Sequence, residues 1–144
     1  ILASIEYATH VVGAKLIVVL GHTGCGAIQA ACNHVEQGHI TQLLQKITPA
    51  IHAEQDISYQ RHGKNQHFVN QVTHLNIAHS MIEIYHRSDI LKNLIKEEKV
   101  GIIGAVYNVS SGLVEFSNYA KQIEAFKEYD STALIEASQS LYAK

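Results

Sequence analysis

Apolar residues along this chain fall into short β-branched runs and longer stretches with helical spacing. The run from Lys15 to Leu20 is rich in valine and isoleucine, which predicts a buried strand of a parallel sheet. Similar runs at 100–107 and 113–116 predict two more strands. The five residues 108–112 between them have the turn chemistry of a hairpin connection.

Stretches with apolar residues three or four apart predict the helices. One is expected over residues 2–12, with Gly13 as its stop, and another from about 25 to 37, ending at Gly38. Ser88 is expected to cap a later helix. The remaining expected helices or amphipathic stretches cover residues 43–51 (interrupted by Pro49), 66–85, 90–95, 118–126 and 132–141, with a polar loop at 56–66.

A strand, a long helical crossover and a second strand together predict an α/β fold. The crossover should be right-handed, so the first two strands should be parallel, and the third should return as a C-terminal hairpin. We expect one partial domain over residues 1–144. Three strands are few for such a sheet, and the chain opens at Ile1 with Met81 as its only methionine. We therefore expect this chain to be a processed protein or part of a longer one, and to lack strands that the preceding sequence would provide.

Composition and charge exclude several classes of function. A net charge of −2 gives no electrostatic case for binding nucleic acid or an anionic membrane surface. No apolar run approaches the ~20 residues of a membrane span, and no signal peptide is recognisable. Two cysteines do not make a disulfide framework and fit a reducing compartment. The predicted location is the cytoplasm.

The candidate chemistry lies in six residues directly after the first strand, Gly21-His22-Thr23-Gly24-Cys25-Gly26. Glycines let the backbone turn sharply at the end of a strand. Imidazole nitrogen and thiolate sulfur are ligands that zinc prefers, and this loop can present both to one ion. On spacing alone, half of a metal site and a glycine turn with a core cysteine both remain open.

Two competing interpretations of the cysteines and glycines are weaker. The glycine spacing is not G-x-G-x-x-G and no Walker lysine follows, so nucleotide binding is not predicted. Cys32 lies seven residues after Cys25, and a buried apolar cysteine is the better interpretation.

The other histidines form no pair three or four residues apart, so we expect them on the solvated surface and in no second metal site. These are His10, His34, His39, His52, His62, His67, His74, His79 and His86.

Residues 4–8, 16–27 and 100–114 together resemble the β-class carbonic anhydrases, in the same order and at similar spacing. The resemblance implies that His22 and Cys25 are the second half of a zinc ligand set and that Gly21, Gly24 and Gly26 form its supporting loop. In that family a Cys-x-Asp-x-Arg element some dozens of residues earlier supplies the first half. This chain has no residues there.

The resemblance therefore implies Zn2+-dependent reversible hydration of CO2 to bicarbonate by the intact parent, as a homodimer or higher oligomer. The chain alone is expected to be inactive, with no catalytic residue of its own besides the metal ligands. A different class remains open: a non-catalytic carbonic-anhydrase-like regulatory or binding domain attached to a sulfate-permease-type anion transporter. A third possibility is a degenerate domain that has lost the metal.

Overall fold

Three strands form one sheet in the order β1–β2–β3 in the computed structural model, which describes residues 1–117. β1 (Leu16–His22) and β2 (Gly101–Tyr107) run parallel, with His22 opposite Tyr107. β3 (Val114–Phe116) pairs antiparallel with β2. This arrangement confirms the predicted α/β fold with a parallel pair and a hairpin. The helices expected at 118–126 and 132–141 lie outside the described residues.

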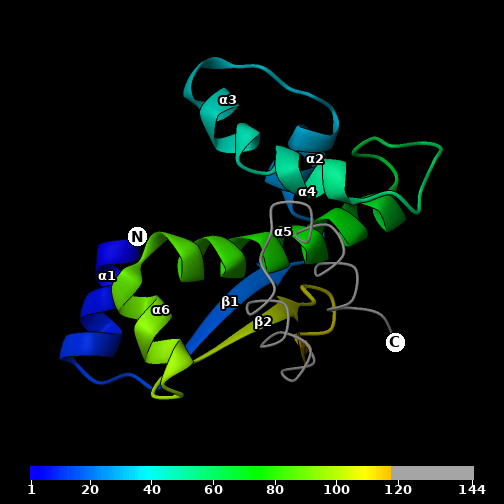
Figure 1. Ribbon diagram of the computed structural model, residues 1–144. Coiled ribbons are helices and arrows are strands. Elements are labelled where there is room, and N and C mark those ends of the chain that lie inside the picture. Colours follow the sequence, from blue (N-terminus) through cyan, green and yellow to red (C-terminus); the bar gives the residue numbers. More distant parts are fainter. Residues whose placement is uncertain (118–144) are drawn as a thin grey trace.

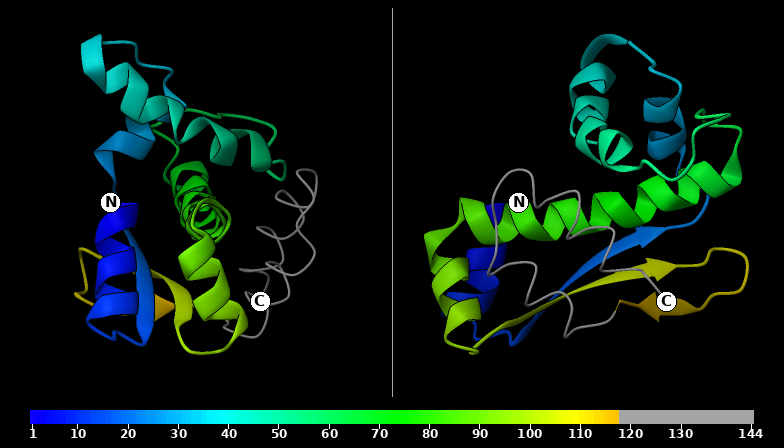
Figure 2. Two further views of the ribbon diagram at one scale, coloured as in Figure 1. Left: turned by 60° about the vertical axis from the view of Figure 1, so that its left-hand side comes forward. Right: turned by 45° about the vertical axis from the view of Figure 1, so that its right-hand side comes forward.

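A long helix, α5 (Gln66–Arg87), crosses one face of the sheet and contacts both β1 and β2 (Figure 1). On its far side lie three short helices, so α5 is the middle of three layers (Figure 2). These are α2 (Gly26–Cys32), α3 (Gly38–Gln45) and α4 (Thr48–Ala53). The chain returns to the sheet through α6 (Asp89–Lys96). No helix within residues 1–117 is long and apolar enough to cross a membrane.

Capping residues mark both ends of α5. The Asn65 side chain accepts hydrogen bonds from the backbone N–H groups of His67 and Phe68, where α5 begins. Ser88 accepts from the N–H of Leu91 at the start of α6, which confirms its predicted capping role.

The first predicted helix is present but changes type halfway. α1 (Leu2–Glu6) is α-helical, and η1 (Tyr7–Val11) is a π-helix, in which the N–H of Val12 donates to the carbonyl of Tyr7. Gly13 follows with φ of +89°, the left-handed conformation expected of a glycine stop.

The helix predicted over 25–37 was wrong at its C-terminal end. α2 stops at Cys32, and His34 takes φ of +52°. The N–H groups of His34 and Val35 then bond back to the carbonyls of Ala31 and Ala30, which closes the helix with a Schellman motif. Gly38 begins α3 instead of ending α2.

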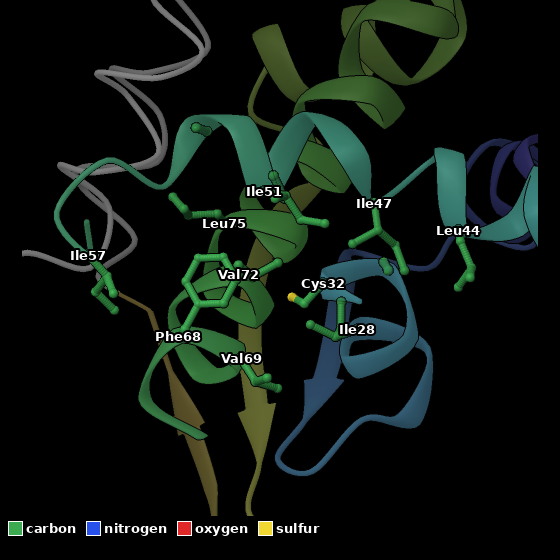
Figure 3. Packing of buried hydrophobic residues seen from close by; sticks show 13 residues of the cluster. Ile28, Cys32, Leu44, Ile47, Ile51, Ile57, Phe68, Val69, Val72 and Leu75 are labelled. Carbon is green, nitrogen blue, oxygen red and sulfur yellow. The ribbon is translucent and has the colours of Figure 1, made fainter. Parts of the chain in front are cut away.

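Two apolar clusters lie on the two sides of α5. One joins α5 to α2, α3 and α4, and Figure 3 shows Cys32, Phe68 and Val72 within it. The other joins α5 to α6 and the sheet through Met81 and Ile102 among others. Phe68 and Val72 lie in the N-terminal half of α5 and Met81 lies in its C-terminal half. α5 therefore contributes side chains to both clusters and joins them.

The opposite face of the sheet carries exposed apolar side chains. Leu16, Val18 and Leu20 alternate along β1 and are 53%, 44% and 55% exposed. β1 also pairs on one side only within residues 1–117, so it is an edge strand there, as expected.

Candidate metal centre

His22 ends β1, and the three residues after it lead into α2, so one short connection carries both candidate ligands. Gly21, which precedes His22 in β1, allows the end of this strand to lie close to α5. A Cβ at this position would lie 2.6 Å from Cδ1 and 3.0 Å from Cγ1 of Ile77. The packing of α5 on β1 therefore requires glycine at position 21 unless Ile77 moves.

The other two glycines predicted to support the loop differ from each other. Gly24 has φ of +67°, in the left-handed region that a side chain disfavours, so the turn itself requires it. A Cβ on Gly26 would meet nothing within 4 Å, and its φ is not positive. The structure gives no conformational reason for glycine at position 26.

The His22 imidazole is exposed and held by one hydrogen bond. Its Nδ1 lies 3.0 Å from the carbonyl oxygen of Thr23. A carbonyl oxygen only accepts, so this bond requires the proton on Nδ1 and leaves the lone pair on Nε2. Metal-ligating histidines are commonly oriented in this way, with one ring nitrogen bound to a carbonyl and the other to the metal.

Cys25 is the N-cap residue of α2 and has an extended backbone conformation. It is half-buried, packs against the α2–α5 cluster and is a free thiol. The loop thus offers one nitrogen and one sulfur donor, the pair that zinc accepts.

The number of ligands is smaller than a zinc ion needs. Residues 1–117 contain no group of three or more histidine, cysteine, aspartate or glutamate side chains placed to hold a metal ion. His22 and Cys25 therefore fit zinc in donor type but supply two ligands, whereas catalytic zinc takes three from protein.

Cys32 belongs to the core and not to this loop. It is 1% exposed, and burial raises the pKa of its thiol to about 11. Metals bind the thiolate, so a thiol with this pKa is a poor ligand at neutral pH. The prediction of a buried apolar cysteine is confirmed.

Three histidines expected on the solvated surface are instead half-buried along α5. Burial lowers the pKa of His74, His79 and His86 below the ordinary value of 6.5. The surface prediction was wrong for these three, because α5 is covered on two sides. The other six histidines in that group are exposed as predicted.

A polar cavity of about 170 Å³ adjoins the loop, between α5 and the carboxyl ends of β1 and β2. Sequence reasoning missed it, although the polar residues at 70, 73 and 74 on one side of α5 were a usable signal. The Glu115 carboxylate partly opposes the effect of burial on the pKa of His74. The cavity is lined by Thr23, Asn70, Thr73, His74, Val106, Asn108 and Glu115.

Sequence comparison matches residues 1–114 to the family model described as carbonic anhydrase. The carbonic anhydrase of Mycolicibacterium smegmatis is 26% identical over 128 residues, covering 85% of this chain and 59% of that protein. Carbonic anhydrase 2 of Mycobacterium tuberculosis is 26% identical over 117 residues, covering 78% of this chain and 53% of that protein. The chain therefore spans little more than half the length of these curated relatives.

Solved structures show the same fold at low sequence identity. The Coccomyxa β-carbonic anhydrase in complex with acetazolamide has a TM-score of 0.69 and 18% identity, covering 81% of this chain and 53% of that one. The β-carbonic anhydrase CafA of Aspergillus fumigatus has a TM-score of 0.66 and 19% identity, covering 99% of this chain and 63% of that one. The match to the family model over most of the chain, together with this fold, places the protein in the carbonic anhydrase family, with the architecture of its β class.

Proposed function

We propose that this chain supplies His22 and Cys25 to the zinc site of a β-class carbonic anhydrase, which reversibly hydrates CO2 to bicarbonate. The observation that carries the proposal is the His22 ring, whose Nδ1 bonds to the Thr23 carbonyl and leaves Nε2 for a metal. Membership of the carbonic anhydrase family supports the reaction.

Zinc, when bound, lowers the pKa of a water ligand to ~7, which makes hydroxide available at neutral pH. The roles of this chain's residues are to hold and orient the ion. His22 would donate through Nε2 and Cys25 through its thiolate, and neither would transfer a proton in the reaction. The remaining protein ligands would come from a Cys-x-Asp-x-Arg element on a further segment or a partner subunit, as the family resemblance implies.

The same proposal includes assembly into a homodimer or higher oligomer and a cytoplasmic location. The uncovered apolar side chains on β1 favour association. One of two β-carbonic anhydrases of Sordaria macrospora, described as tetrameric, shares the fold at a TM-score of 0.63 and 20% identity, with 79% of this chain and 57% of that one covered. Both cysteines are free thiols, as expected in a reducing compartment.

The transporter-attached domain considered from sequence gains no support. The relatives and structures named above are all carbonic anhydrases, and no specific feature of residues 1–117 favours a regulatory domain.

Zinc content measured by elemental analysis, without chelator during purification, tests the ligand assignment. In an assembly that supplies the remaining ligands, we expect about one zinc per chain, and Cys25→Ser should release it because serine is a poor zinc ligand. Cys32→Ala is the matched control, because it removes a thiol from the core and leaves the loop unchanged. Retention of zinc by Cys25→Ser would remove Cys25 from the site.

The chain by itself should hydrate CO2 at a rate close to background. Two ligands hold zinc weakly and leave its orientation undefined, so the isolated chain lacks a competent site. Stopped-flow measurement of CO2 hydration with added zinc checks this expectation. A rate comparable with that of an intact enzyme would contradict it.

A further inference from the structure

Thr23, which stands between the two candidate ligands, uses its backbone and its side chain to contact three different groups. Its N–H donates to the carbonyl of Tyr107 at 3.0 Å. Its Oγ1 accepts from the N–H of Val109 at 3.2 Å, a contact between residues 86 positions apart. Its carbonyl oxygen receives the His22 Nδ1–H at 3.0 Å. Thr23 thus connects the ligand loop to the β2–β3 hairpin.

The hairpin is well built to serve as an anchor. The Asn108 side-chain oxygen accepts from the N–H groups of Ser110 and Ser111 at 3.0 and 3.2 Å. The N–H of Asn108 donates to the carbonyl of Leu113, and the N–H of Gly112 donates to the carbonyl of Asn108, both at 2.8 Å. Its two ends continue directly into paired strands. These bonds define the position of the Val109 N–H that meets Thr23.

We propose that Thr23 is a positioning residue for His22, acting through the hairpin. Its hydroxyl bond to Val109 and its N–H bond to Tyr107 hold the peptide whose carbonyl receives the His22 Nδ1–H. With the proton held on Nδ1, Nε2 keeps its lone pair, which a metal can accept. Without the anchor the carbonyl moves, and the proton is free to occupy either nitrogen.

This inference rests on the proposed function for its consequence, which is a correctly oriented zinc ligand. The tautomer of His22 is itself a property of the metal-free chain. A measurement of that tautomer therefore separates the two proposals. It also separates positioning from a merely structural role, because loss of stability alone does not select one ring nitrogen.

The test compares Thr23→Val, which keeps the shape and removes the acceptor, with Thr23→Ser, which keeps the hydroxyl. Two-bond 15N–1H correlation spectra of the metal-free full chain, recorded at about pH 8 where ordinary histidines are neutral, report which ring nitrogen carries the proton. His22→Ala assigns the signal. Thr9→Val is the matched control, because the Thr9 hydroxyl bonds within its own helix, to the carbonyl of Ile5.

We expect the Nδ1–H tautomer to dominate in the wild type, in Thr23→Ser and in Thr9→Val. In Thr23→Val the ratio of Nδ1–H to Nε2–H should fall about fivefold or more, the change that the loss of one ordinary hydrogen bond produces. An unchanged ratio in Thr23→Val would overturn the inference, and so would a mixed tautomer in the wild type.

A second variant loosens the anchor without touching the ligand loop. Asn108→Ala removes the side-chain oxygen that fixes Ser110 and Ser111, so it should shift the His22 ratio in the same direction. A ratio equal to that of the wild type would count against the role of the hairpin. If the chain shows these shifts but an assembly that supplies the remaining ligands binds no zinc, the proposed function is refuted and the positioning role of Thr23 stays supported.

Discussion

The buried carboxylate of Glu54 offers a direct test of how the layer formed by α2, α3 and α4 supports the loop that carries His22 and Cys25. Glu54 is 4% exposed, and its Oε1 accepts from the N–H groups of Asp56 and Ile57, each at 2.9 Å. Its Oε2 pairs with Arg61, which also donates to the carbonyls of Ile57 and Ile51. One carboxylate therefore organises the start of the loop between α4 and α5.

That loop bears directly on α2, which begins at Cys25. The N–H of Gly63 donates to the Asn33 side chain at 2.8 Å. A Cβ on Gly63 would lie 2.5 Å from the carbonyl oxygen of Gln29. The backbone of the loop thus packs against the C-terminal half of α2 without an intervening side chain. Loss of the Glu54–Arg61 pair should weaken this contact.

Glu54→Gln keeps the size of the side chain and removes its charge. Breaking a buried ion pair costs about 3–5 kcal/mol, but the Arg61 side chain is 32% exposed and keeps two carbonyl partners. We therefore expect a loss of about 2–3 kcal/mol in the free energy of unfolding. With a urea slope of about 2 kcal/mol per molar for a small domain, the midpoint should fall by about 1–1.5 M.

The assay is urea unfolding followed by circular dichroism, with Glu97→Gln as the control. Glu97 pairs with Lys99 on the surface, where the two side chains are 54% and 63% exposed, so the same chemical change should cost less than about 1 kcal/mol. If both variants lower the midpoint equally, the Glu54 pair does not organise the loop and the reasoning fails.

Two further predictions concern stability. Gly63→Ala should destabilise the fold by about 1–3 kcal/mol because its Cβ meets the Gln29 backbone, whereas Gly26→Ala should meet no atom, and urea midpoints of the two variants check this. Burial lowers the pKa of His79 in the folded state below the ordinary 6.5, so its contribution to stability is complete above pH 6.5 and is lost as pH falls toward the folded pKa. The free energy of unfolding should therefore fall as pH is lowered below about 6.5, and less steeply in His79→Leu. Equal slopes would contradict the assignment.

The elements predicted correctly from sequence are those in which one local signal dominates. The β-branched run before Gly21 predicts a strand, and β1 lies there. Its predicted burial was wrong for one face, where Leu16, Val18 and Leu20 are exposed. The apolar spacing over 66–85 predicts a long helix, and α5 extends two residues beyond the predicted end. Ser88 caps α6 because its hydroxyl competes well for a free N–H at a helix start.

The elements predicted wrongly depend on contacts that periodicity does not reveal. The end of α2 depends on a left-handed residue, His34, and on an Asn33 side chain that bonds to Gly63, which lies 30 positions away. His74, His79 and His86 of α5 are half-buried because separate layers cover two sides of that helix. Neither the layering nor the distant contact leaves a pattern in the local sequence.

The candidate site likewise combines a feature with a local sequence signal and a feature that depends on a distant contact. Its two donors lie three positions apart and could be found from their spacing and flanking residues. The Thr23–Val109 bond joins residues 86 positions apart, and only the structure reveals it. His22 also ends the strand whose outer side has no partner within residues 1–117 and whose alternate side chains are exposed. On the proposed function, a segment or subunit that brings the remaining ligands to His22 must approach this same strand. Zinc binding and the covering of β1 should then be coupled, because the contacts that complete the ligand set also bury Leu20 and its neighbours.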